Sequence, residues 1–150
     1  MPEKFIRLTD QYYVSPQISL DDVAIAADQG FTLIVSNRPD GEMPGQPPST
    51  EMEAAAKAAN IQYAHIPIDG RGLSMSHISA LKSALNEVKN GKALAFCASG
   101  TRSVILRSYS EATDGRSSED IIAEAAAAGF NISPHAQALE SLAARTEEDE

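Results

Sequence analysis

Three short apolar runs alternate with helix-like segments through the middle of the chain, and this order constrains the fold more than any other feature. The runs are FTLIVSN, IQYAHIPI and KALAF, which start at residues 31, 61 and 92. Each is compact and apolar, as buried strands are. Because strands that alternate with helices favour a parallel sheet covered on both faces, we predict an α/β fold with a mostly parallel central sheet flanked by helices.

Capping residues and glycines mark where the helices begin and end. Ser19 precedes acidic residues that favour the positive end of a helix, and Gly30 ends the same pattern. Thr50 and Glu53 have the spacing of a capping box ahead of an Ala-rich helix. Further helices are predicted over 74–90, 103–113, 117–129 and 134–145, with one or two strands within 5–14.

The length of the chain suits one domain. Its 150 residues can bury a core without metals or disulfides. We predict that this single domain covers residues 1–145. The last five residues, TEEDE, are acidic, and we predict that 146–150 form a disordered tail.

Charge and composition argue against several kinds of partner. The net charge of -9 disfavours nucleic acid and anionic membranes, because nothing offsets the repulsion of their phosphates. No run approaches the roughly 18 apolar residues of a membrane span, and the opening MPEKFIRLTD has no apolar leader segment, so we expect a cytoplasmic protein. His65, His77 and His135 are scattered singly and the chain has one cysteine, so we expect neither a metal site nor a cofactor.

The stretch ALAFCASGTRS, residues 93–103, places that single cysteine at the end of a predicted strand and just before a helix. Ligands of open α/β sheets bind beyond the carboxyl ends of the strands, where the next helix directs its free N–H groups and positive end. Cys97 should be drawn toward the reactive thiolate by this helix and by Arg102. A second interpretation stays open, in which Cys97 is a small buried apolar residue and Arg102 lies on the surface.

The residues between the cysteine and the arginine suit an anion-binding loop. Most are small, and Gly100 lets the backbone turn its amides inward. Arg102 offers a planar fork for two oxygens of a tetrahedral anion. Ser103 could donate a hydrogen bond to the sulfur as it departs. The predicted oxyanion-binding residues are Ala98, Ser99, Gly100, Thr101 and Arg102.

Three motifs in this order resemble a known family. NRPDGEMPGQP (37–47), YAHIPIDG (63–70) and CASGTRS (97–103) are similar to the bacterial phosphatase-like domain of beta-lactamase hydrolase-like proteins. That family is related to the cysteine-dependent, dual-specificity-like phosphatases and to the rhodaneses. The resemblance covers roughly 5–140 and implies a three-layer fold like that of the dual-specificity phosphatases, with hydrolase or sulfurtransferase activity.

The resemblance also implies roles for individual residues. Cys97 matches the nucleophile, Arg102 the phosphate-binding arginine and Ser103 the hydroxyl that follows it. Asp69 matches the general acid, although an aspartate before Gly70 is equally typical of a turn.

Two further residues are second-line candidates. Arg38 and Asp40 lie in the Pro-rich segment that follows a parallel strand, so they should reach the same edge of the sheet as Cys97. Asp40 before Gly41 also fits a plain turn.

Three functions therefore stay open. The first is hydrolysis of a phosphate monoester through a cysteinyl phosphate. The second is sulfur transfer through a Cys97 persulfide, which the four residues between Cys97 and Arg102 favour, because rhodaneses have this short loop and the phosphatases have one residue more. The third is a non-catalytic module that binds an anion or a partner. Each predicts a small anionic ligand, a phosphate ester or a sulfane-sulfur donor in the two enzymatic cases, and none predicts an oligomeric state.

Overall fold

A five-stranded sheet forms the centre of the molecule. The computed structural model describes residues 4–89 and 91–148. The strand order is β1-β2-β5-β3-β4, with β1 antiparallel to β2 and every other neighbouring pair parallel. The mostly parallel sheet predicted from the sequence is confirmed. The strands are β1 (Ile6–Thr9), β2 (Tyr12–Ser15), β3 (Leu33–Ser36), β4 (Gln62–His65) and β5 (Ala93–Phe96).

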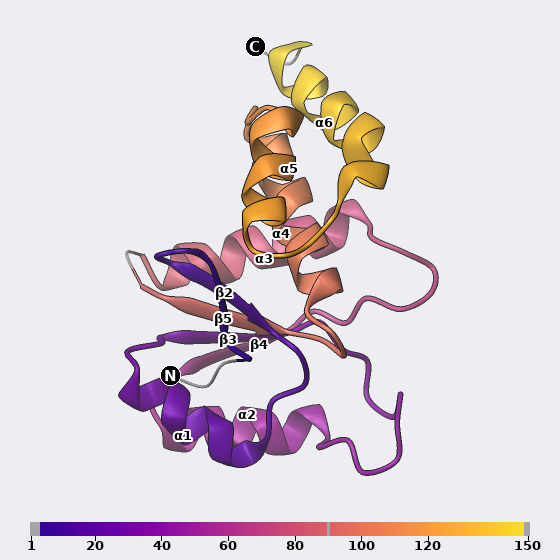
Figure 1. The fold of residues 1–150 in the computed structure, drawn as a ribbon. Helices are drawn as coiled ribbons and strands as arrows, with labels where there is room; N and C mark the ends of the chain where they lie inside the picture. Colours follow the sequence, from indigo (N-terminus) through magenta and orange to yellow (C-terminus); the bar gives the residue numbers. More distant parts are fainter. Residues whose placement is uncertain (1–3, 90, 149–150) are drawn as a thin grey trace.

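Helices cover both faces of this sheet (Figure 1). One layer holds α1 and α2, and the other holds α3 and α4, with the remaining helices packed against α4. The predicted arrangement of a sheet flanked by helices is therefore confirmed. The helices are α1 (Leu20–Asp28), α2 (Ser49–Ala58), α3 (Met75–Glu87), α4 (Thr101–Thr113), α5 (Ser118–Ala127), the 3-10 turn η1 (Ser133–His135) and α6 (Ala136–Glu148).

The apolar strands contribute side chains to two separate cores, because successive side chains of a strand point to opposite faces of the sheet. In β3, Ile34 belongs to the core beneath α1 and α2. Its neighbours Leu33 and Val35 belong to the larger core beneath α3 and α4. All three are buried, which explains why β3 reads as a continuous apolar run rather than as an alternation.

Two of the predicted helix caps are confirmed. The Ser19 side chain accepts a hydrogen bond from the Asp22 amide, and Asp22 reaches back to the Ser19 amide, which completes a capping box at α1. Ser117 accepts a hydrogen bond from the Asp120 amide at the start of α5. Side chains thus satisfy amides that have no partner inside these helices.

The capping box predicted at Thr50 and Glu53 is wrong. Pro48 stands at the N-cap position of α2 and makes no side-chain cap. The Ser49 amide instead donates to the Asp40 carboxylate at 2.8 Å. A residue from the preceding loop therefore does the capping, which spacing within the helix sequence does not reveal.

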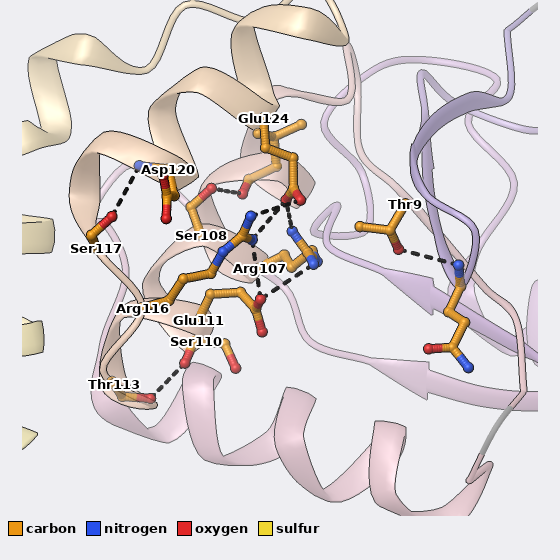
Figure 2. Close-up of polar contacts among 12 residues, drawn as sticks. Thr9, Arg107, Ser108, Ser110, Glu111, Thr113, Arg116, Ser117, Asp120 and Glu124 are labelled. Carbon is orange, nitrogen blue, oxygen red and sulfur yellow. Dashed lines mark hydrogen bonds and ion pairs between the residues drawn. The ribbon is translucent and has the colours of Figure 1, made fainter.

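Ion pairs join α4 to α5 (Figure 2). Glu124 of α5 accepts from Arg107 of α4 and from Arg116 in the connection, and Glu111 pairs with both arginines. Arg107 also stacks over the buried Tyr12 ring, with 5.5 Å from its guanidinium carbon to the ring centroid. These contacts anchor the helix whose first turn follows Cys97.

The last helix extends into the segment predicted to be a disordered tail. Helix α6 continues to Glu148, whereas the predicted domain boundary lies at residue 145. Residues 149 and 150 lie outside the described part.

Helices α3, α4 and α6 have 13 residues each, and in the described ranges no helix is long and apolar enough to cross a membrane.

Candidate active site

The segments that follow β3, β4 and β5 meet at one edge of the sheet (Figure 1). These strands are parallel, so their carboxyl ends lie side by side. Segment 37–48 follows β3, segment 66–74 follows β4 and segment 97–100 follows β5. The fold thus brings together the three sequence motifs, which lie far apart along the chain.

Cys97 is completely buried, yet its sulfur faces hydrogen-bond donors. The Gly100 amide donates to Cys97 Sγ at 3.0 Å. Burial alone raises the pKa of the Cys97 thiol, but backbone N–H groups around the sulfur outweigh that effect and hold the pKa below its ordinary value. The contributing amides are those of Ser99, Ser103, Arg102 and Gly100. A buried apolar cysteine would lack this set of donors.

Gly100 allows the backbone conformation that directs these amides toward the sulfur. It caps α4 in the left-handed region, with a φ of 95° that other residues rarely adopt. A Cβ at this position would lie 3.4 Å from the Phe130 ring and 3.6 Å from the Ser15 backbone. These are ordinary contact distances, so the backbone conformation rather than space favours glycine in the loop, as the sequence predicted.

The Arg102 guanidinium lies near the sulfur and binds a carboxylate through two hydrogen bonds. Nη1 donates to Glu42 Oε2 at 2.8 Å and Nη2 donates to Glu42 Oε1 at 2.9 Å. Nη1 also donates to the Ile68 carbonyl at 2.8 Å. The pairing with Glu42 raises the pKa of Arg102, and the nearby Cys97 sulfur adds to this effect. The fork that should receive an oxyanion thus holds an anion supplied by the chain itself.

Glu42 lies between two guanidinium groups. Arg38 Nε donates to Glu42 Oε1 at 3.0 Å, while Arg38 Nη1 donates to Gln17 Oε1 at 3.0 Å. The hydrogen bonds from Arg102 and Arg38 hold the pKa of Glu42 below its usual value, despite the opposing effect of burial. The second-line candidate Arg38 therefore reaches the site, through Glu42. Asp40 does not, because its carboxylate caps α2.

Ser103 makes a different hydrogen bond from the one predicted. Its hydroxyl donates to Asn37 Oδ1 at 2.8 Å and not to the sulfur, whereas its backbone amide does face the sulfur. Asn37 in turn donates through Nδ2 to the Ile66 carbonyl at 3.0 Å, and through its backbone amide to the Phe96 carbonyl at 2.8 Å. Both side chains are buried, so Asn37 ties the first turn of α4 to the ends of the strands.

Asp69 and Arg102 both line one cavity next to α4. The Asp69 carboxylate pairs with Arg71, with 2.8 Å from Arg71 Nη2 to Oδ2 and 2.9 Å from the Arg71 amide to Oδ1. These hydrogen bonds lower the pKa of Asp69 to about 2. In this conformation the carboxyl group is ionised and belongs to a turn, as the second interpretation from the sequence predicted. Its role as a general acid stays a prediction.

Two residues that sequence reasoning missed are Glu42 and Asn37. Both lie in the motif NRPDGEMPGQP, where Glu42 follows Arg38 by four positions. An acidic residue in a loop at the sheet edge was the available signal for Glu42.

For metals, the described ranges contain no group of three or more His, Cys, Asp or Glu side chains that could hold an ion.

Sequence comparison finds a family that covers most of the chain. The model of the phosphatase-like domain of beta-lactamase hydrolase-like proteins matches residues 4–114. A beta-lactamase hydrolase-like protein from Agrobacterium fabrum is 36% identical over 113 residues, which are 75% of this chain and 26% of that protein. The chain thus spans about a quarter of the length of this curated relative.

Solved structures with the same fold include phosphatases. A candidate phosphatase from Neisseria meningitidis superposes with a TM-score of 0.80 at 27% identity, and the match covers 94% of this chain and 99% of that one. The kinase associated phosphatase, solved with its catalytic-site cysteine replaced by serine, superposes with a TM-score of 0.73 at 14% identity over 96% of this chain and 94% of that one. The second likeness shows a shared fold, and it confirms the predicted similarity to the dual-specificity-type phosphatases.

Proposed function

The chain belongs to the family of phosphatase-like domains of beta-lactamase hydrolase-like proteins, and we propose that it hydrolyses a phosphate monoester with Cys97 as the nucleophile. One observation carries this proposal. The sulfur lies in a ring of amides that lowers its pKa, beside an arginine whose fork holds the two oxygens of a carboxylate. A phosphate group presents a similar pair of oxygens, with more charge.

In the first step the Cys97 thiolate attacks phosphorus in line with the ester oxygen. The S–P bond forms, the P–O bond breaks, and the leaving oxygen takes a proton from Asp69. The amides of 98–102 and the Arg102 fork bind the three equatorial oxygens. Because Cys97 is buried and the fork is filled, the substrate must first displace Glu42. The phosphate then takes the place of the Glu42 carboxylate, so the Arg102 guanidinium keeps an anionic partner.

Asp69 must be protonated for this step, whereas its pairing with Arg71 favours the ionised form. A phosphate dianion bound at Arg102 lies close to Asp69 and raises its pKa by repulsion between like charges. The pair with Arg71 is exposed and weak, so it can break as the substrate binds. In the second step the Asp69 carboxylate takes a proton from water, the water oxygen attacks phosphorus, and the S–P bond breaks to return the thiolate.

Sulfur transfer is the second candidate function, and the short loop favours it. Four residues separate Cys97 from Arg102, which is the loop length of rhodaneses. The preceding residue, Phe96, packs in the core beneath α1 and α2, so it offers the sulfur no polar support. This reaction needs no general acid, so it predicts that Asp69→Asn leaves the rate unchanged.

A paired assay separates these functions. Release of phosphate from p-nitrophenyl phosphate and formation of thiocyanate from thiosulfate and cyanide are measured on the wild type and on Cys97→Ser. We expect phosphate release only from the wild type, inhibition by vanadate, and no thiocyanate. A gain of one sulfur atom in mass together with thiocyanate would replace this proposal with sulfur transfer. Neither activity, with a thiol pKa near the free value of about 8.5, would leave a binding module.

A further inference from the structure

A cavity of about 360 Å³ begins at the Arg102 side chain. The segment after β4 forms one wall, with Ile68 and Leu73 as its aliphatic residues and Asp69 at the edge. The cavity is therefore lined by both the phosphate-binding arginine and the acid of the proposed function. Its volume falls in the range of small-molecule sites.

Helix α4 forms the opposite wall. Arg102, Ile105 and Tyr109 follow a spacing of three and then four residues, which places them on one face of the helix. The stripe starts at the guanidinium and runs roughly 10 Å along the helix axis. A group attached to a phosphate at Arg102 would lie along Ile105 and end near Tyr109.

The far end of the cavity is aromatic. Tyr109 Oη and His135 Nδ1 are 2.7 Å apart, and the two rings meet edge to face with centroids 5.5 Å apart. The Tyr109 hydroxyl and one of the two ring nitrogens of His135 thus partner each other, and the lining of the cavity as a whole is largely apolar. Among the residues that line the cavity, Asp and Arg side chains occur only at the near end, as Asp69 and Arg102.

We propose that this cavity is the leaving-group subsite and that it takes an uncharged apolar group, a short hydrocarbon chain or a single ring. The inference rests on the proposed phosphatase function, and it specifies the substrate class as monophosphate esters of apolar alcohols. Polyanionic substrates fit poorly, because Arg102 is the single arginine among the residues that line this cavity and the rest of the lining is largely apolar. The net charge of -9 opposes them further.

A second hollow gives longer groups a place to extend. It has a volume of about 270 Å³, is largely apolar, and shares Leu73 and Tyr109 with the first. It continues past Met75, which is exposed, toward Leu142 of α6. We therefore expect the affinity to rise gradually as carbon atoms are added to the leaving group, with no sharp limit at the size of one ring.

The test uses alkylphosphonates, because their P–C bond is not hydrolysed and binding can be measured alone. Calorimetry gives the Kd of ethyl-, butyl- and hexylphosphonate for the wild-type chain. Burial of each added methylene should tighten binding by about threefold, so the Kd should fall by about eightyfold from ethyl to hexyl, which differ by four methylenes. A phosphonate of the same length that ends in a carboxylate should bind at least about tenfold more weakly than hexylphosphonate.

A matched pair of variants locates the effect. Leu73→Ser removes an aliphatic wall in a loop, and it should raise the Kd of hexylphosphonate by about tenfold while that of ethylphosphonate changes by less than about twofold. Leu20→Ser makes the same change at an exposed leucine of α1, on the opposite side of the sheet, and should leave the series unchanged.

The outcomes separate this inference from the proposed function. Equal Kd values along the series, or equal responses of the two variants, overturn the subsite while hydrolysis of p-nitrophenyl phosphate still supports a phosphatase. If that ester is not hydrolysed, the phosphatase fails, and the subsite fails with it as a leaving-group site even where the phosphonates bind in the expected order.

Discussion

The two halves of the candidate site are built in different ways. The half that would bind phosphate, residues 97–103, consists of backbone amides around the buried Cys97 and a glycine in a conformation that few other residues adopt. The half that would move protons depends on exposed side chains, since Asp69 is 44% exposed and its partner Arg71 is 91% exposed. Anion binding is therefore preorganised, whereas the acid rests on an ion pair that substrate and salt can rearrange.

The largest expected effect lies in the preorganised half. Cys97→Ser keeps the shape of the loop but replaces the nucleophile with a hydroxyl of much higher pKa. Turnover of p-nitrophenyl phosphate should fall by about a thousandfold or more, while inorganic phosphate should still bind, because the amides and Arg102 stay in place. Stopped assays and calorimetry measure these two quantities. Residual turnover within about tenfold of the wild type would rule out Cys97 as nucleophile.

The contrast between the halves also explains what sequence can predict. The order of strand, cysteine, glycine and helix is local, so the position of Cys97, the bend at Gly100 and the three-layer fold all follow from short-range patterns. The partners of Arg102 and Ser103 are not local. Glu42 and Asn37 come from a segment about 60 residues earlier, and only packing decides which side chain fills the fork.

Asp40 illustrates the same limit of prediction from sequence, because it was a candidate for the site and does not reach it. Its place in the motif suggested a route to the anion site, and a plain turn was the alternative. The structure uses its carboxylate to cap α2, nine residues further along the chain. A sequence pattern identifies residues that can form an ion pair or a cap. It does not show which of several possible partners such a residue contacts in the folded protein.

The second prediction concerns the proposed acid. Asp69→Asn cannot protonate a leaving oxygen, so hydrolysis of an alkyl phosphate should slow by about a hundredfold, whereas p-nitrophenyl phosphate, with its good leaving group, should change by only a few fold. Comparison of kcat for the two esters measures the difference. Asp40→Asn is the matched control and should leave the ratio unchanged. Equal slowing of both esters by Asp69→Asn would remove Asp69 from this role.

The third prediction addresses the carboxylate that fills the fork. Glu42→Gln removes a charge that competes with the substrate, so the Kd of inorganic phosphate should fall, by about fivefold, as Arg102 becomes easier to free. The same substitution at Glu53, which is exposed on α2, should have no effect. Weaker phosphate binding by Glu42→Gln would show instead that Glu42 holds Arg102 in its binding position.

The smallest expected effect comes from the exposed ion pair itself. Arg71 lowers the pKa of Asp69 to about 2, and a general acid works only at pH values below its own pKa. Arg71→Gln removes the cation, so the pKa of Asp69 rises and the basic limb of kcat for an alkyl phosphate should move to higher pH. Because both side chains are exposed and screened by salt, we expect about half a pH unit, which is about a threefold change in rate on that limb.

Arg7→Gln provides the control for this shift, since Arg7 is another exposed arginine in an ion pair, with Asp10, away from the candidate site. It should leave the pH profile unchanged. The profile for p-nitrophenyl phosphate should not move in either variant, because that ester needs little help from an acid. If Arg71→Gln leaves the alkyl phosphate profile where it is, a group other than Asp69 sets the basic limb, and the proton-transfer half of the site must be sought among other residues of the rim.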